Sequence, residues 1–129
     1  MNIEELSELV NQQFAELTEK YRGLCCEKDR SHISVSGNLS FLAHYNGISI
    51  EDEYTVEITV PEGYPQILPT AKEIGGRIPK DFHTYPDKTL CLGSPIETKM
   101  KFRNRETLLG FVEDLLIPFL YGYSYREKC

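Results

Sequence analysis

The sequence contains no tryptophan, only two methionines and no long apolar run, and its 20 acidic residues outnumber its 14 basic ones. Without an apolar run that could cross a bilayer, and with no charged-then-apolar signal peptide at its start, the chain is expected to be cytoplasmic. The formal net charge of −6 disfavours nucleic acid and anionic lipid as partners, because both attract clustered cations. Proteins or small molecules are therefore the expected partners.

Low-complexity tracts, internal repeats and phosphate-binding glycine loops are also absent from the sequence. A hydrophobic content of 40% and a charged content of 26% are typical of a folded globular protein. A chain of 129 residues has room for one core, so we expect a single domain over residues 1–129. Any ATP chemistry that the protein depends on is expected to occur elsewhere.

The four cysteines are expected to be free thiols: Cys25, Cys26, Cys91 and Cys129. A cytoplasmic protein is kept reduced, and two adjacent cysteines make a poor disulfide framework. Cys25 and Cys26 together with His32 match no standard zinc spacing, and a fourth ligand is not evident. No metal is expected.

Apolar residues at helical spacing predict an amphipathic helix over residues 3–21, with Asn2 and Glu5 as a capping box and Gly23 ending it. The stretch that follows is highly charged and is expected to be a loop. From residue 33 onward the apolar period changes to two, which predicts antiparallel strands joined near Asn46 and Gly47.

The proline-rich residues 61–69 are expected to leave the sheet, and a short strand over residues 70–74 to rejoin it. Residues 75–102 show no period and predict a long irregular loop of the kind that often carries function. A last helix is predicted from about Arg105, with Asn104 as its N-cap and Pro118 stopping or bending it. The tyrosines that follow should either bind a partner or pack over the sheet: Tyr121, Tyr123 and Tyr125. The fold class is α+β, with helices on one face of an antiparallel sheet of about four strands.

Two stretches of this chain resemble the ubiquitin-conjugating enzyme family: the proline loop of residues 60–65 with Pro69, and residues 82–92, FHTYPDKTLCL. In that family a strand ends in a proline-rich turn, and a histidine-containing loop then leads to a Cys-Leu pair whose cysteine carries a thioester. Cys91 lies at this position. Residues 116–122 are most similar to small bacterial conjugating-enzyme homologues from CBASS anti-phage operons.

The resemblance implies a UBC-like fold and an enzyme that forms a thioester on Cys91 with a partner protein's C-terminus and transfers it, without a cofactor. For the bacterial homologues the implied partner is a cGAS/DncV-like nucleotidyltransferase. The alternative is a catalytically inactive UBC-fold module that only binds a partner, although such variants typically lack the cysteine. A cysteine hydrolase is less favoured, because no histidine has an evident Asn or Asp partner.

Candidate site residues lie on both sides of Cys91. His83 is a candidate base or oxyanion donor, and a structural role for it is favoured. Asp87 and Glu97 are candidates to deprotonate or orient an incoming lysine, unless they are simply solvated. Five residues are assigned to binding: Tyr85, Thr89, Leu92, Gly93 and Glu97. Of these, Tyr85 is expected to cover the thiol, contact the tail or merely anchor the loop.

The sequence departs from the family in three places. Residues 85–91 match the family loop only if two residues after His83 are missing, which removes the asparagine that stabilises the oxyanion in that family. His83, Thr84 or backbone amides are expected to serve instead. The tryptophan that often follows the cysteine is absent, and the first helix is acidic, whereas in the family it is often basic and docks on an activating enzyme.

Overall fold

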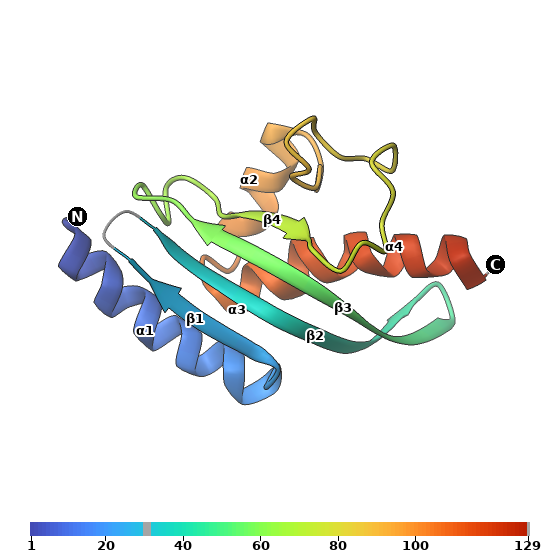
Figure 1. Ribbon diagram of the computed structural model, residues 1–129, viewed down its shortest axis with the longest axis horizontal. Coiled ribbons are helices and arrows are strands. Elements are labelled where there is room, and N and C mark those ends of the chain that lie inside the picture. The colour runs from blue at the N-terminus through green and yellow to red at the C-terminus, as the bar shows by residue number, and fades with distance from the viewer. Residues whose placement is uncertain (30–31, 129) are drawn as a thin grey trace.

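The computed structural model describes residues 1–29 and 32–128 of the chain. The elements are α1 (Ile3–Lys20), β1 (Leu24–Lys28), β2 (Ile33–Tyr45), β3 (Ile48–Val60), β4 (Thr70–Glu73), α2 (Pro95–Arg103), α3 (Leu108–Phe111), the π-helical turn η1 (Val112–Leu116) and α4 (Ile117–Lys128). The fold is α+β, with an N-terminal helix, a four-stranded antiparallel sheet and a C-terminal helix. In Figure 1 the sheet forms one layer and α4 passes behind it, with the two termini at opposite ends.

Helix α1 confirms the prediction from the sequence to within one residue. The side-chain oxygen of Asn2 accepts a hydrogen bond from the Glu5 amide at 2.8 Å and so caps the helix. One face of the helix is buried through Leu6, Val10 and Leu17. After the helix, Gly23 approaches the neighbouring strand so closely that a Cβ atom would lie 2.4 Å from the carbonyl oxygen of Asn38. Only glycine fits there.

The sheet has the order β1-β2-β3-β4, and its long hairpin forms where the sequence places it. Tyr45 pairs with Ile48 across the two-residue turn of Asn46 and Gly47, whose φ angles of 52° and 80° suit a tight hairpin. Strand β4 pairs with the second half of β3 and confirms the predicted short strand. The apolar side chains of both long strands alternate inward, which places the helices against one face.

Strand β1 was not predicted, because its charged end was interpreted as part of a loop. It pairs with β2 as an edge strand, with Leu24 buried and its last residues exposed. An edge strand with one face in solvent tolerates such charge. The ammonium group of Lys28 crosses to α1, where it donates to the hydroxyl of Ser7 at 2.9 Å and to the side chain of Asn11.

The prediction of an irregular connection throughout residues 75–102 is wrong in its last part, which forms α2. The hydroxyl of Ser94 caps this helix by accepting from the Glu97 amide at 3.2 Å, and Pro95 occupies its first position. Phe102 is the one buried residue of this helix. A helix that buries so little has no apolar period to reveal it in the sequence.

The last helical segment begins later than predicted and does not stop at Pro118. Asn104 caps the end of α2, while the hydroxyl of Thr107 accepts from the amide of Gly110 at 2.9 Å and starts α3. The π-helical turn η1 widens the helix immediately before Pro118. Because a widened turn reduces the clash between a proline ring and the preceding carbonyls, α4 continues to Lys128.

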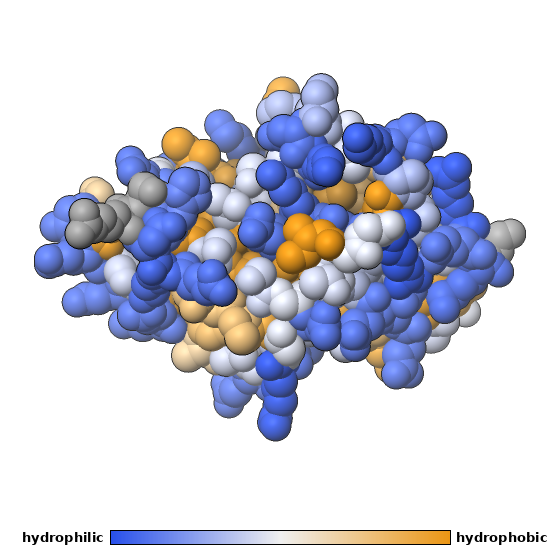
Figure 2. Space-filling view, in the orientation of Figure 1, coloured by the Kyte–Doolittle hydropathy of each residue, from blue (hydrophilic) through white to orange (hydrophobic). Residues whose placement is uncertain are grey.

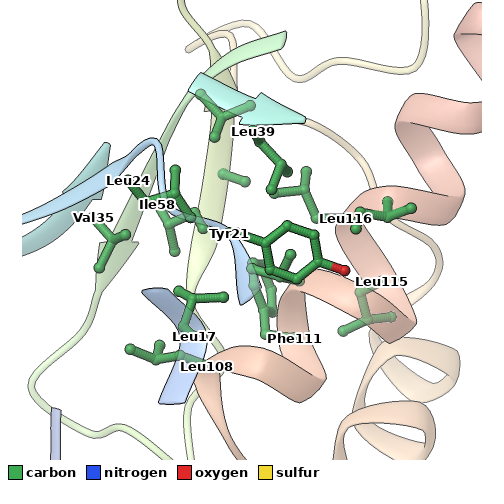
Figure 3. Packing of buried hydrophobic residues seen from close by; sticks show 14 of the residues in the cluster. Leu17, Tyr21, Leu24, Val35, Leu39, Ile58, Leu108, Phe111, Leu115 and Leu116 are labelled. Atoms are coloured by element: carbon green, nitrogen blue, oxygen red, sulfur yellow. The ribbon is translucent and has the colours of Figure 1, made fainter. Parts of the chain in front are cut away.

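The buried core lies between the sheet and the helices that cover it. Figure 3 labels ten of its side chains, which come from α1 and the turn after it, from the sheet and from the C-terminal helices: Leu17, Tyr21, Leu24, Val35, Leu39, Ile58, Leu108, Phe111, Leu115 and Leu116. Phe111 is fully buried, so its truncation to alanine would cost about 3–5 kcal/mol. On the face seen in Figure 2, apolar residues are interspersed among hydrophilic ones.

The tyrosines of α4 mostly pack over the sheet. Tyr121 and Tyr123 are buried, and their hydroxyls donate to the carbonyl oxygens of Ile48 at 2.8 Å and Arg77 at 3.1 Å. Tyr125 remains exposed and stacks on Tyr121. Of the two predicted roles, packing therefore applies to the first two tyrosines.

Candidate functional site

Tyr64 anchors the proline loop of residues 61–69 to the core. This side chain is buried, its ring lies 6.0 Å from that of Phe102, and its hydroxyl donates to the side-chain oxygen of Gln13. The same oxygen of Gln13 accepts from the Leu108 amide at 3.2 Å. One side chain of α1 thus joins the proline loop to the start of α3.

The segment that follows β4 is held to the sheet and to α4 by Arg77. Its guanidinium donates two hydrogen bonds to the carboxylate of Asp52, at 2.8 and 2.7 Å, and two to the carboxylate of Glu127, at 2.6 and 3.2 Å. It also lies 4.1 Å from the centre of the Tyr54 ring. The hydrogen bonds from Arg77 outweigh partial burial and hold the pKa of Asp52 well below its usual range. The start of the loop is therefore fixed in position.

Phe82 anchors the next part of the loop in an aromatic cluster on α4. Its ring lies 5.6 Å from that of Phe119 and 4.9 Å from that of Tyr123, and Arg126 lies over it at 5.2 Å. His83 follows with a positive φ of 48°, and its imidazole packs edge-on against the Phe82 ring at 4.8 Å. The chain changes direction sharply at His83.

Residues 83–91 form a narrow closed loop. Three backbone contacts close it: the Cys91 amide donates to the His83 carbonyl at 2.7 Å, Thr84 pairs with Leu90, and the Tyr85 amide donates to the Thr89 carbonyl at 2.8 Å. Leu90 is buried, and its amide donates to the carbonyl of Ala71 in β4 at 2.8 Å. Cys91 consequently lies at the base of the loop, directly beside the end of the sheet.

The thiol of Cys91 faces the phenol of Tyr85. Cys91 is half-buried, and its Sγ lies 3.5 Å from Tyr85 Oη and 3.8 Å from the carbonyl oxygen of Gly93. The hydrogen bond with Cys91, and the charge that its thiolate would carry, raise the pKa of the exposed Tyr85 phenol. Of the roles that the sequence predicts for Tyr85, a position over the thiol is the one that the structure shows, with a hydrogen bond from the Cys91 thiol to the phenol oxygen.

The acidic candidates do not contact the thiol. Asp87 accepts a hydrogen bond from the Thr89 amide at 3.0 Å, and the hydrogen bonds from Thr89 lower its pKa. It therefore stabilises the tip of the loop. Glu97 lies exposed in the first turn of α2, where its backbone is capped by Ser94. Within residues 1–29 and 32–128, neither carboxylate has a hydrogen bond with Cys91.

The two side chains that were expected to stabilise the oxyanion, those of Thr84 and His83, are also directed elsewhere. The hydroxyl of Thr84 donates to the carbonyl oxygen of Lys80. The imidazole of His83 packs on Phe82, and in the described part of the chain it has no hydrogen-bond partner. The contribution of His83 to the site is its carbonyl oxygen, which holds the Cys91 amide. This agrees with the structural role that the sequence favours.

A groove of about 360 Å³ lies beside the loop and is bordered by residues on both sides of Cys91. The proline loop and the first turns of α2 form its walls. Four of the five residues assigned to binding border it, namely Tyr85, Thr89, Leu92 and Gly93, whereas Glu97 is not part of its lining. Gly93 has a φ of 145°, and a Cβ atom there would lie 3.4 Å from the methyl carbon of Thr98. Only glycine adopts this conformation readily.

The remaining thiols lie away from the groove or outside the described residues. Cys25 is exposed on β1, and Cys26 beside it is half-buried, which raises its pKa. Cys129 lies outside the residues that the structure describes. Among those residues, no three or more His, Cys, Asp or Glu side chains gather where they could hold a metal ion.

Comparisons with protein-family models, with curated proteins and with solved structures found no match to this chain. The family resemblance thus depends on the two motifs and on the order of the elements. Within residues 1–29 and 32–128, no helix combines the length and the apolar character that crossing a bilayer requires.

Proposed function

We propose that this chain is a ubiquitin-conjugating-enzyme-like cysteine transferase with a UBC-like fold, which carries a partner protein's C-terminus as a thioester on Cys91. The observation that carries the proposal is the position of this thiol. It is partly accessible, it is held at the base of a rigid loop, and it lies beside a groove bordered by its own neighbours in the chain. The two family motifs flank the same groove.

The chemistry suits a thiol in such a setting. In loading, the Cys91 thiolate attacks an activated C-terminal carbonyl, the carbon–sulfur bond forms and the activating group leaves with its electron pair. In transfer, an amine attacks the thioester and the thiolate leaves. An ordinary cysteine has a pKa of about 8.5 and is partly ionised near neutral pH, so the carrier needs access more than a strong base.

The groove offers a path for an extended tail. Leu92 and Gly93 border it immediately after the thiol, and Gly93 has no side chain to obstruct a backbone that approaches closely. Ile67, on the opposite wall, is 58% exposed and can contact an apolar side chain of the tail. An extended segment bound in this way presents its terminal carbonyl to the sulfur.

The proposed partner follows from the resemblance of residues 116–122 to the bacterial CBASS homologues. On that reading the carried C-terminus belongs to a cGAS/DncV-like nucleotidyltransferase, and the protein acts in anti-phage defence in the bacterial cytoplasm. The acidic face of α1 distinguishes this chain from conjugating enzymes that dock a eukaryotic-type activating enzyme through a basic helix.

The second candidate function is a catalytically inactive binding module. The groove favours it, because a groove of this kind can hold a tail without any chemistry. The retained thiol argues against it, since binding alone does not require a cysteine beside the groove. A hydrolase is disfavoured because His83, the histidine nearest in the loop, turns its ring towards Phe82.

The two functions are separated by offering Cys91 an acyl group that is already activated. The protein would be incubated with a synthetic peptide thioester that carries the C-terminal sequence of the candidate nucleotidyltransferase. Intact-mass spectrometry would then measure the adduct before and after treatment with a thiol reductant. A carrier gains one thiol-labile peptide, and Cys91→Ala loses it. Cys91→Ser would instead form a more stable oxygen ester, more slowly.

Cys25→Ala is the matched control, because Cys25 is also an exposed thiol but lies on β1. It should load at the same rate as the natural sequence. Peptide binding without an adduct on Cys91 would support the binding module and overturn the carrier.

A further inference from the structure

A loaded thioester needs a hydrogen-bond donor for the negative charge that develops on its carbonyl oxygen. The family's asparagine is missing here, and the side chains of His83 and Thr84 are directed to Phe82 and to the Lys80 carbonyl. Among the described residues, the side chain that faces Cys91 is the phenol of Tyr85: its oxygen accepts a hydrogen bond from the thiol, and its own hydrogen remains available to donate once the thiol is acylated. The asparagine donor of the family is therefore absent from this loop, and the phenol of Tyr85 lies beside the sulfur instead.

We propose that the hydroxyl of Tyr85 is the oxyanion donor of this site, an inference that depends on the proposed carrier function. In the free protein its oxygen lies 3.5 Å from Cys91 Sγ. The carbonyl oxygen of a thioester is two bonds from that sulfur, so rotation about the Cys91 side chain brings it within hydrogen-bond distance of the phenol. The donor is therefore in place before the acyl group arrives.

The backbone of Tyr85 is fixed on both sides. Its amide donates to the Thr89 carbonyl and its carbonyl accepts from the Lys88 amide, each at 2.8 Å. A donor held in this way needs little reorganisation when charge appears beside it. An ordinary tyrosine has a pKa of about 10, and in the free protein the hydrogen bond with Cys91 raises the pKa of Tyr85 further, so the phenol stays protonated near neutral pH. It acts as a donor and not as a base.

Tyr85 keeps its proton and its charge throughout the transfer step. The nitrogen of a neutral amine attacks the thioester carbon, the carbon–nitrogen bond forms, and the carbonyl electron pair moves to oxygen. The phenol donates its hydrogen bond to that oxygen. The electron pair then returns, the carbon–sulfur bond breaks and Cys91 leaves as thiolate. The proton lost from nitrogen passes to solvent or buffer base, and Tyr85 keeps its own.

The test uses the variant Tyr85→Phe, which removes the hydroxyl and keeps the ring. Cys91 is loaded with a peptide benzyl thioester in a protein that also carries Cys25→Ser, Cys26→Ser and Cys129→Ser. Excess reagent is removed, and the loss of the acyl group to free lysine is followed by intact-mass spectrometry. We expect the first-order discharge rate of Tyr85→Phe to fall by about 10- to 100-fold.

Tyr125→Phe is the matched control, because Tyr125 is an exposed tyrosine on α4. Its discharge rate should stay within twofold of the parent. If Tyr85→Phe loads normally and discharges as fast as the parent, or faster, Tyr85 is not the donor and the carrier function stands. If the parent itself never gains an acyl group on Cys91, the carrier function fails and the donor role fails with it.

Discussion

The guanidinium of Arg77 binds both oxygens of the Asp52 carboxylate, at 2.8 and 2.7 Å, and so joins the segment before the thiol loop to β3. The pair is reinforced by the hydroxyl of Ser124, which donates to Asp52 at 2.6 Å from α4. Three parts of the chain that are distant in sequence meet at this carboxylate. We expect the pair to control the stability of the site as well as that of the sheet edge.

Arg77→Lys should lower the free energy of unfolding by about 1–3 kcal/mol, because lysine keeps the charge but cannot form the paired hydrogen bonds. Urea unfolding followed by circular dichroism would measure the change. Arg103→Lys serves as the control, since Arg103 forms an exposed pair with Glu106 and its replacement should cost less than about 0.5 kcal/mol. Equal losses of unfolding free energy in the two variants would contradict a special role for the paired hydrogen bonds of Arg77.

The Asp52 pair should also make stability dependent on pH. The pKa of Asp52 is lowered in the folded protein by the Arg77 hydrogen bonds, so its contribution is fully present above the unfolded pKa of about 3.9 and is lost as the pH falls towards the folded value. Below about pH 4 the stability difference between the natural sequence and Asp52→Asn should therefore shrink. Urea unfolding of both proteins at pH 7 and at pH 3 would measure this difference in the free energy of unfolding. A difference that grows at low pH would contradict this sign.

Two helical glycines should respond to alanine in opposite directions. Gly122 is exposed in α4 and has open space around it, so Gly122→Ala should stabilise the protein by about 0.5–1 kcal/mol through helix propensity. A Cβ atom on Gly110 would lie 2.1 Å from the carbonyl oxygen of Arg105, so Gly110→Ala should destabilise it. Thermal unfolding of both variants in the same buffer would measure the two changes in melting temperature. Melting temperatures that shift in the same direction would refute the prediction.

His83 should be dispensable for transfer, because its ring packs on Phe82. His83→Asn is the informative variant, since asparagine tolerates the positive φ of 48° better than most residues. Discharge of a preformed thioester on Cys91 should stay within about twofold of the parent, whereas removal of an active donor or base costs far more. A tenfold fall in the discharge rate, with unchanged stability, would instead assign His83 a catalytic role.

Long periodic elements could be predicted from the sequence, and short ones could not. Helix α1 and the hairpin of β2 and β3 bury one regular face each, which leaves a clear period. Helix α2 buries only Phe102, and β1 has five residues at an edge, so neither has such a period. The passage of α4 through Pro118 depends on the π-helical turn before it, which no local pattern indicates.

The residues around the groove could be named from the sequence, whereas their geometry could not. Cys91 and the four groove residues came from motif and order, but the pairing of Tyr85 with Cys91 requires the loop to close across six positions. A signal for this closure was present, because Pro86 and Asp87 are typical turn residues and Asp87 does bind the Thr89 amide. Interpreting residues 83–91 as a tight turn would have placed the two side chains together.

The edge strand β1 has a consequence for how copies of this protein behave towards one another. An open sheet edge can recruit a strand from another molecule, and β1, which covers the first part of β2, offers only five residues, the last two of them charged. Lys28 is also tied back to α1 through Ser7. A neighbouring chain that pairs with β1 would have to displace that lysine and align with a very short template, so β1 itself disfavours edge-to-edge association.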